Sequence, residues 1–232
     1  MKRWVKILAV LGALVVAGNL AWCVAYPRYE WRQKITVEVE TPQGLVSASS
    51  VAEIAWWGVP KILPDATPRD WSVNAEAVVV PLPDGKYLFA LVRTAHLIAR
   101  AVLFDPPYGG DPYLEPASRM KRFEGEVHDI QPENYPLLVT FDDINDPVSV
   151  KRVDPDDLAA SFGPGVSLKR MTLEITDEQV TEGRVQTVLA WLEAVGRDRA
   201  SLIADPPLLS TDLTDPDIQL LGPSAFSTEL YK

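Results

Sequence analysis

The sequence predicts an α+β protein with one N-terminal transmembrane helix, followed by a single domain with a mainly antiparallel sheet and about three helices. Three observations lead to this prediction: a long apolar run near the start, segments that alternate apolar and polar residues, and short amphipathic segments with capping residues. We divide the chain into an anchor with its flanks over 1–34, an α+β domain over 35–196, and an extended arm rich in proline and aspartate over 197–232.

The apolar run covers residues 7–26, and Asn19 is its one non-aromatic side chain with strong hydrogen-bonding groups. At about 1.5 Å per residue, a helix of this length rises roughly 30 Å, which matches the hydrocarbon core of a bilayer. We therefore expect a membrane span over about 5–26. A cleaved signal peptide, with a shorter apolar region of about 7–15 residues, is a less favoured alternative. A lipid anchor on Cys23 is less favoured too, because bulky Trp22 precedes it.

The charges on either side of the run predict its orientation. Lys2, Arg3 and Lys6 precede the run, while residues 28–34 carry a net charge of +2. The positive-inside rule then places the amino terminus in the cytoplasm and exports the rest of the chain. This predicts a single-pass membrane protein with an exported carboxyl-terminal domain.

A stripe of small side chains recurs every fourth residue along the same run. Such stripes let two helix backbones approach closely within a membrane. The predicted partners are therefore the membrane itself and, through the stripe, another membrane protein or a second copy of this chain. The stripe consists of Ala9, Ala13, Ala17, Ala21 and Ala25.

Charge and cysteine content exclude several function classes. The chain has 232 residues and a net charge of −10, and residues 35–232 alone carry 16 basic and 31 acidic side chains, a net charge of −15. A domain this acidic repels phosphate backbones, so we expect no nucleic-acid binding. Cys23 is the only cysteine, which excludes an intramolecular disulfide and a CxxC metal site. We predict no cofactor.

Alternation and turn residues predict the strands of the sheet. The segment 34–41 alternates strictly and reaches a turn at Thr41-Pro-Gln-Gly44, which predicts a hairpin with the segment that follows it. Asp84-Gly85 predicts a second hairpin. Of the adjacent Trp56 and Trp57, whose side chains face opposite ways on a strand, we expect one to pack in the core. The predicted strands are 34–41, 45–57, 75–80, 87–92, 137–141 and 168–176.

Three helices are expected to pack on this sheet. Thr94 can cap a helix that continues to residue 104. Asp154 can cap a second helix over 155–162, with a proline at its first position. The third, over 184–195, has the clearest apolar stripe.

Acidic residues after the strand 137–141 admit two interpretations. Asp142, Asp143 and Asp146 could hold a metal ion, with His128 as a neighbour, or they could form turns by accepting hydrogen bonds from nearby backbone amides. The segment lacks the glycine and distant glutamate of an EF-hand loop. We favour the turn.

Basic residues gather at one place in the acidic domain, at Arg119, Lys121 and Arg122. We expect them to pair with acidic side chains of the same domain, because acidic residues are so abundant. Binding of an anionic ligand is the alternative.

Two stretches carry a resemblance to known proteins. The run from Leu138 to Val185, which begins LVTFDDINDPVSVKRVDPDDLAASFGPGV, and the stretch from Trp31 to Gly44 resemble uncharacterised bacterial proteins with one amino-terminal membrane span. The resemblance implies a single-pass anchor in a bacterial inner membrane, followed by a single exported domain in the periplasm. It implies no activity and no catalytic residues.

Three functional hypotheses follow. The first is a membrane-anchored, envelope-facing, non-catalytic domain that binds or scaffolds another protein. The second is a metal-assisted hydrolase that uses Asp142, Asp143 and Asp146; the third is a sensor of cations or small ligands that uses the same 142–146 cluster. The chain has no GxSxG motif and no Cys–His pair, so an enzyme is the less favoured class.

Overall fold

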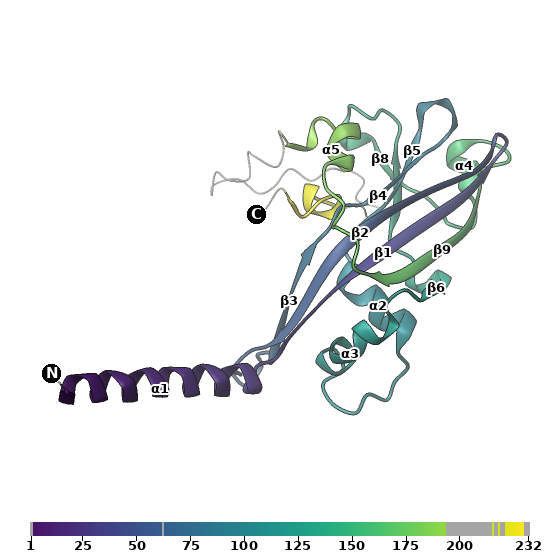
Figure 1. The fold of residues 1–232 in the computed structure, drawn as a ribbon. Coiled ribbons are helices and arrows are strands. Elements are labelled where there is room, and N and C mark those ends of the chain that lie inside the picture. Colours follow the sequence, from purple (N-terminus) through teal and green to yellow (C-terminus); the bar gives the residue numbers. More distant parts are fainter. Residues whose placement is uncertain (1, 62, 194–214, 216–217, 219–220, 230–232) are drawn as a thin grey trace.

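The computed structural model describes residues 2–61, 63–193, 215, 218 and 221–229. A long helix, α1 (Lys2–Ala25), leads directly into two antiparallel sheets with short helices around them (Figure 1). The α+β class and the mainly antiparallel sheet are therefore confirmed. The described residues contain five α-helices, which is more than the anchor and about three helices that we expected.

The first sheet has five strands in the order β3-β2-β1-β9-β6. A long hairpin of two strands forms its centre, and every second residue of β1 from Trp31 to Val39 is buried, as the alternation in the sequence predicts. The hairpin begins at Arg28, earlier than the predicted 34, because this burial pattern continues back through Trp31. The strands are β1 (Arg28–Thr41), β2 (Gly44–Gly58), β3 (Arg69–Asn74), β6 (Val127–Asp129) and β9 (Ser167–Thr176).

The second sheet has four strands in the order β4-β5-β7-β8. Its first hairpin closes through η1 (Pro83–Gly85), where Asp84 and Gly85 both have positive φ, as an Asp-Gly turn requires. All four residues of β7 are buried, since the sheet is covered on both faces. The strands are β4 (Val78–Pro81), β5 (Tyr87–Ala90), β7 (Leu138–Phe141) and β8 (Val150–Arg152).

Two hydrophobic cores give the domain three layers. The first core fills the space between the two sheets and α2, and it contains Val37, Ile54 and Leu88. The second core lies on the other face of the second sheet, where Phe89 meets Phe226 of the carboxyl-terminal segment. Adjacent residues of β5 thus enter different cores, which explains its uninterrupted apolar sequence.

The helices are shorter than the sequence suggests. The predicted helix at 94–104 is confirmed. The one predicted at 155–162 begins only at Leu158, because Asp157 rather than Asp154 accepts the capping hydrogen bond, from the Ala160 amide. The helices of the domain are α2 (Ala95–Leu103), α3 (Leu114–Arg119), α4 (Leu158–Phe162) and α5 (Arg184–Val188), with 3₁₀ turns η2 (Met120–Phe123), η3 (Pro132–Asn134), η4 (Pro147–Ser149) and η5 (Pro223–Ala225).

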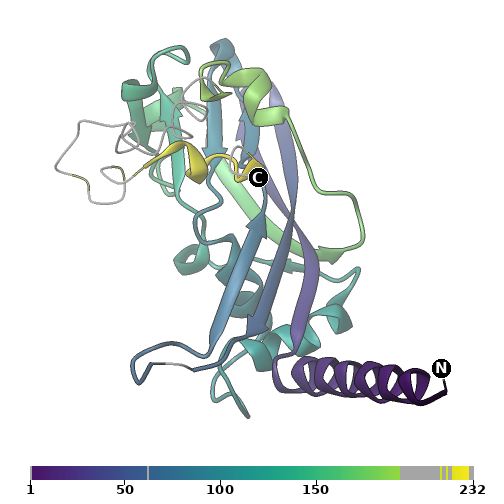
Figure 2. The ribbon, with the colours of Figure 1, turned by 90° about the vertical axis from the view of Figure 1, so that its left-hand side faces the viewer.

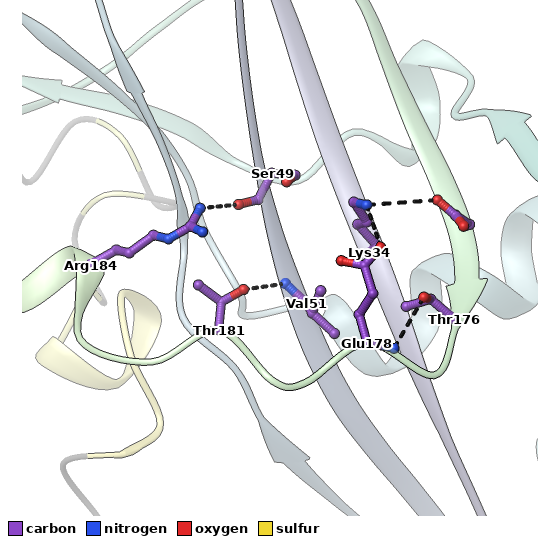
Figure 3. A network of polar contacts seen from close by, with 8 residues as sticks. Lys34, Ser49, Val51, Thr176, Glu178, Thr181 and Arg184 are labelled. Atoms are coloured by element: carbon purple, nitrogen blue, oxygen red, sulfur yellow. Dashed lines mark hydrogen bonds and ion pairs between the residues drawn. The ribbon is translucent and has the colours of Figure 1, made fainter.

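The crossing segment, residues 177–183, connects β9 to α5 and passes over the outer face of the first sheet (Figure 3). Glu178 accepts a hydrogen bond of 2.6 Å from Lys34 Nζ, which raises the pKa of Lys34. Thr181 exchanges two hydrogen bonds with the backbone of Val51, at 2.9 and 3.0 Å. The crossing segment therefore covers the edge of β2 at Val51, beyond the end of its pairing with β3.

The predicted membrane anchor needs correction. Helix α1 forms and stands out from the sheets in two perpendicular views (Figures 1 and 2), and large apolar side chains such as Leu14 and Val15 are exposed. Among the residues that the structure describes, however, no helix is long and apolar enough to cross a membrane. This contradicts the predicted span over 5–26, the single-pass topology and the inner-membrane location.

The division of the chain into 1–34, 35–196 and 197–232 stays a prediction. Most of the expected carboxyl-terminal arm lies outside the described residues. Its described part includes Leu221 and Phe226, which are buried in the second core.

Candidate functional site

A group of aromatic and arginine side chains lies where β2, β3 and α2 meet. We call it the aromatic–arginine cluster; it consists of Trp56, Trp71, His96, Tyr113, Arg69 and Arg100. Trp56 and Trp71 are register partners on neighbouring strands, so their side chains point to the same face of the sheet. His96 and Arg100 are four residues apart on α2, which places both on one side of that helix.

The rings of the cluster are stacked. The centroids of Trp71 and His96 are 4.9 Å apart with 16° between the planes, and those of Trp56 and Tyr113 are 4.8 Å apart with 22°. Trp56 and Trp71, 5.5 Å apart, join the two pairs. Offset stacking of this kind is worth about 0.5–1.5 kcal/mol per pair beyond the buried area, so the four rings hold one another in place.

Two guanidinium groups contact the same tyrosine. The Cζ atoms of Arg69 and Arg100 lie 4.2 and 4.5 Å from the centroid of the Tyr113 ring. Arg69 also donates to Asp111 at 2.8 Å, in an ion pair that is only about one-fifth exposed on either side. Although burial acts to raise the pKa of Asp111, hydrogen bonds from the Leu114 and Tyr113 amides and the Arg69 charge lower it below its ordinary value.

His96 is held in its neutral form by its surroundings. Burial lowers the pKa of His96, and the nearby Arg100 charge lowers it further. The main-chain oxygen of His96 accepts a hydrogen bond of 3.3 Å from Trp56 Nε1, which fixes the helix against the sheet. The ring is therefore a flat, uncharged support for Trp71.

Trp71 is the exposed member of the cluster. It retains 47% of its accessible surface, whereas Trp56 retains 4%. The neighbouring Asp70 is exposed, and its carboxylate accepts a hydrogen bond of 2.8 Å from the Trp71 amide. Trp71 therefore presents a rigid, partly exposed aromatic face, which is suited to binding a cation or an apolar side chain.

The predicted metal residues do not join this cluster. Asp143 accepts a hydrogen bond of 2.9 Å from the Asn145 amide, and Asp146 accepts one of 3.1 Å from the Val148 amide, as expected for turns. Asp142 pairs with Lys151. His128 lies on β6 of the first sheet, beside Glu126, whereas the three aspartates follow β7 of the second sheet.

Within the described part of the chain, no three His, Cys, Asp or Glu side chains are grouped so that they could hold a metal ion. The metal-assisted hydrolase and the sensor therefore gain no support from the structure, and both stay predictions.

The other residues singled out in the sequence have structural partners or stay untested. Arg119 pairs with Glu115 at 3.0 Å and lies over Phe104, so its expected internal pairing is observed. The stripe residues Ala13, Ala17, Ala21 and Ala25 are exposed on α1, and the side chain of Ala9 is not described. Helix contact through the stripe stays a prediction.

Sequence reasoning missed most of the aromatic–arginine cluster. It expected one member of the Trp56–Trp57 pair to pack, and Trp56 does so while Trp57 lies under Arg28. Trp71 lies outside the strands predicted from the sequence, and nothing local indicates that Tyr113 lies beside Trp56. The one usable signal was the gathering of tryptophans at 56, 57 and 71.

Comparisons with protein-family models, with curated proteins and with solved structures find no match for this chain. The resemblance to bacterial single-span proteins thus stays a prediction, and a functional proposal has to be argued from the geometry.

Proposed function

We propose that this protein is a non-catalytic binding module whose exposed Trp71 receives a basic segment of another protein. The observation that carries the proposal is the exposure of Trp71, at 47%, on top of a ring stack that fixes its position. An indole held in this way loses little side-chain entropy when a partner binds.

The composition of the cluster supports a binding role. Tryptophan, tyrosine and arginine are the residue types that most often carry the binding energy of protein interfaces. Most of these groups already contact one another beneath Trp71, so the surface is preorganised.

Charge supports a basic partner. A lysine or arginine side chain of the partner can lie over the indole face of Trp71 in a cation–π contact. The net charge of −15 over residues 35–232 would also accelerate the approach of such a partner.

A displayed library of random peptides, selected on the purified protein, tests the proposal. We expect the enriched peptides to combine Arg or Lys with apolar residues. The same peptides, once synthesised, should bind Trp71→Ala about thirtyfold more weakly than the wild-type protein, as for a hot-spot residue. Affinity, measured by fluorescence anisotropy, should fall as salt rises.

Leu45→Ala is the matched control, because Leu45 is 53% exposed on β2 but lies near the far end of the hairpin. Selected peptides that bind Trp71→Ala as tightly as the wild type would contradict the role of Trp71. Enrichment of acidic instead of basic peptides would contradict the stated partner.

A further inference from the structure

The backbone of β3 has one side that faces away from the rest of the sheet. β3 is the first strand in the order of the five-stranded sheet, and β2 is its neighbour on the other side (Figure 1). In an antiparallel pair, alternate residues of a strand direct both main-chain groups to the neighbouring strand, and the residues between them direct both groups away from it. The outward residues of β3 therefore decide what this edge offers to another chain.

Hydrogen bonds beyond both ends of β3 identify the outward residues. The main-chain oxygen of Pro68 accepts a hydrogen bond of 3.0 Å from the Val59 amide, so the even-numbered residues of this segment face β2. The main-chain N–H and C=O of Ala75 instead both bond to Thr228, at 2.9 Å each, so the odd-numbered residues face outward. The outward residues of β3 are thus Arg69, Trp71 and Val73.

The carboxyl-terminal segment already pairs with the continuation of this edge. It runs antiparallel to residues 75–77, where Ser227 forms a bridge with Glu76 and the Phe226 oxygen accepts a hydrogen bond of 2.7 Å from the Ala77 amide. Within the described part of the chain, no hydrogen bond reaches the Trp71 oxygen or the outward main-chain groups of Val73. The edge of β3 is therefore open directly beside a stretch that the chain fills itself.

The outward amide of Trp71 has a partner that another chain can replace. This amide donates to the carboxylate of the adjacent, exposed Asp70 at 2.8 Å. A carbonyl oxygen of an added strand can take over that hydrogen bond, and the released carboxylate can then accept from a basic side chain of the same strand. Directly opposed residues of paired strands have Cβ atoms about 4.5–5.5 Å apart, so a lysine or arginine opposite Trp71 can reach its indole.

We propose that the basic partner segment adds to the edge of β3 as an extended strand and places one basic side chain over Trp71. This inference rests on the proposed function and specifies how the partner binds. In recognition by strand addition, main-chain hydrogen bonds supply affinity and alternate side chains supply specificity. The crossing segment covers the neighbouring stretch of the same edge at Val51, which leaves β3 for the partner.

A methyl scan of the selected peptides tests the added strand. The peptides are resynthesised with a single N-methyl group at each position in turn, which removes one amide donor at a time. We expect about tenfold weaker binding at every second position along the bound stretch and little change at the positions between, since only alternate amides of an added strand face β3.

The scan separates this inference from the proposed function. Peptides that depend on Trp71 but tolerate the methyl group at every position would overturn strand addition and leave the proposed function intact. Binding that Trp71→Ala leaves unchanged would contradict the proposed function, and this inference with it.

A variant of the protein tests the same contact from the other side. Val73→Pro removes an outward N–H that β2 does not use, and proline is accepted at such positions of an edge strand. We expect it to weaken peptide binding about tenfold. Val73→Ala is the matched control, because it removes the same partly buried side chain but keeps the amide. Equal affinity for the two variants, both with wild-type circular dichroism, would overturn the proposal.

Hydrogen exchange in the wild-type protein tests the contact without any substitution. Saturating peptide should slow exchange of the Val73 amide at least about tenfold and leave the Gln43 amide, in the turn at the far end of the hairpin, unchanged. Unchanged exchange at Val73 would overturn strand addition. Sedimentation velocity identifies the occupant: a dimer that Val73→Pro dissociates would show that a second copy pairs with β3 and would overturn the basic partner.

Discussion

The carboxylate of Glu76 is the most deeply buried acidic group that the structure describes, with 2% of the residue exposed. It accepts hydrogen bonds from the backbone amides of Arg184 and Val185, at 3.0 and 3.4 Å, at the start of α5. Its main-chain oxygen accepts another, of 2.8 Å, from Ser50 Oγ. One residue thus joins β2 to α5.

Burial raises the pKa of Glu76 above its ordinary value of 4.5, although the two amide hydrogen bonds oppose the shift. A carboxyl group whose pKa is raised in the folded state makes its full contribution to the free energy of unfolding below pH 4.5, where the group is protonated in both the folded and the unfolded state. That contribution is lost as the pH rises through the folded pKa, because only the folded state then buries the charge.

We therefore expect Glu76→Gln, which keeps an acceptor oxygen, to gain stability relative to the wild type as the pH rises from 4 to 7. Denaturant unfolding at several pH values measures this difference in the free energy of unfolding. Parallel pH profiles for the two proteins would show that Glu76 has no raised pKa. Glu76→Ala is the complementary variant, and it should be about 1–3 kcal/mol less stable than Glu76→Gln at every pH, because the amides of Arg184 and Val185 lose their acceptor.

At the residue scale, the sequence predicted the burial of regular strands well and that of the candidate site poorly. Val37 and Val39 are identified by alternation alone. Trp71, Tyr113 and Arg100 become neighbours only when β3, the segment before α3 and α2 pack together, and no local pattern encodes that packing. The sequence highlighted Asp143 and Asp146 instead, and both accept hydrogen bonds within their own turns.

At the scale of elements, the crossing segment protects an edge of the first sheet. The part of β2 that precedes Glu53 does not pair with β3, and without the crossing segment its backbone would offer unpaired groups to another chain. Thr181 bonds to both backbone groups of Val51, and Arg184 donates to the main-chain oxygen of Ser49 at 3.0 Å (Figure 3).

Thr181→Val preserves the shape of the side chain but removes the oxygen that accepts from the Val51 amide. We expect a loss of about 1–2 kcal/mol in the free energy of unfolding and faster hydrogen exchange at that amide. Nuclear magnetic resonance measures the exchange residue by residue. Gln179→Ala, an exposed change in the same segment, is the control; equal protection of Val51 in both variants would contradict this role of Thr181.

Elements that local patterns specify were predicted, and elements defined by distant partners were missed. Both hairpins have turn residues between alternating or apolar runs, so β1, β2, β4 and β5 could be found. The strands β3, β6 and β8 are only three to six residues long and owe their extended form to pairing with neighbours. The helix expected at 184–195 ends at Val188, yet Leu189 and Leu192 of its apolar stripe are fully buried.

At the scale of the whole molecule, the carboxyl-terminal segment completes the second core. The main-chain oxygens of Phe226 and Ala225 accept hydrogen bonds from Ala77 and Val92, at 2.7 and 3.0 Å. The ring of Phe226 is fully buried between Phe89 and Phe141. Residues near the end of the chain therefore hold one face of the second sheet.

We expect Phe226→Ala to lower the free energy of unfolding by about 3–5 kcal/mol. Hydrogen exchange should accelerate more at β5 and β7 than at β1 and β9, because the substitution opens only the second core. Phe123→Ala, in the periphery of the first core, serves as the comparison. A uniform acceleration over both sheets would mean that the two cores open as one unit.

The direct passage from α1 into β1 has a mechanical consequence. Only Tyr26 and Pro27 separate the two elements, and the main-chain oxygen of Pro27 accepts a hydrogen bond of 3.1 Å from the Gly58 amide, at the end of β2. β1 pairs with β2 along its whole length and with β9 over much of it. A pull on the helix along this strand would load the hydrogen bonds on both sides in shear, all at once, so the domain would resist tension through its central strand.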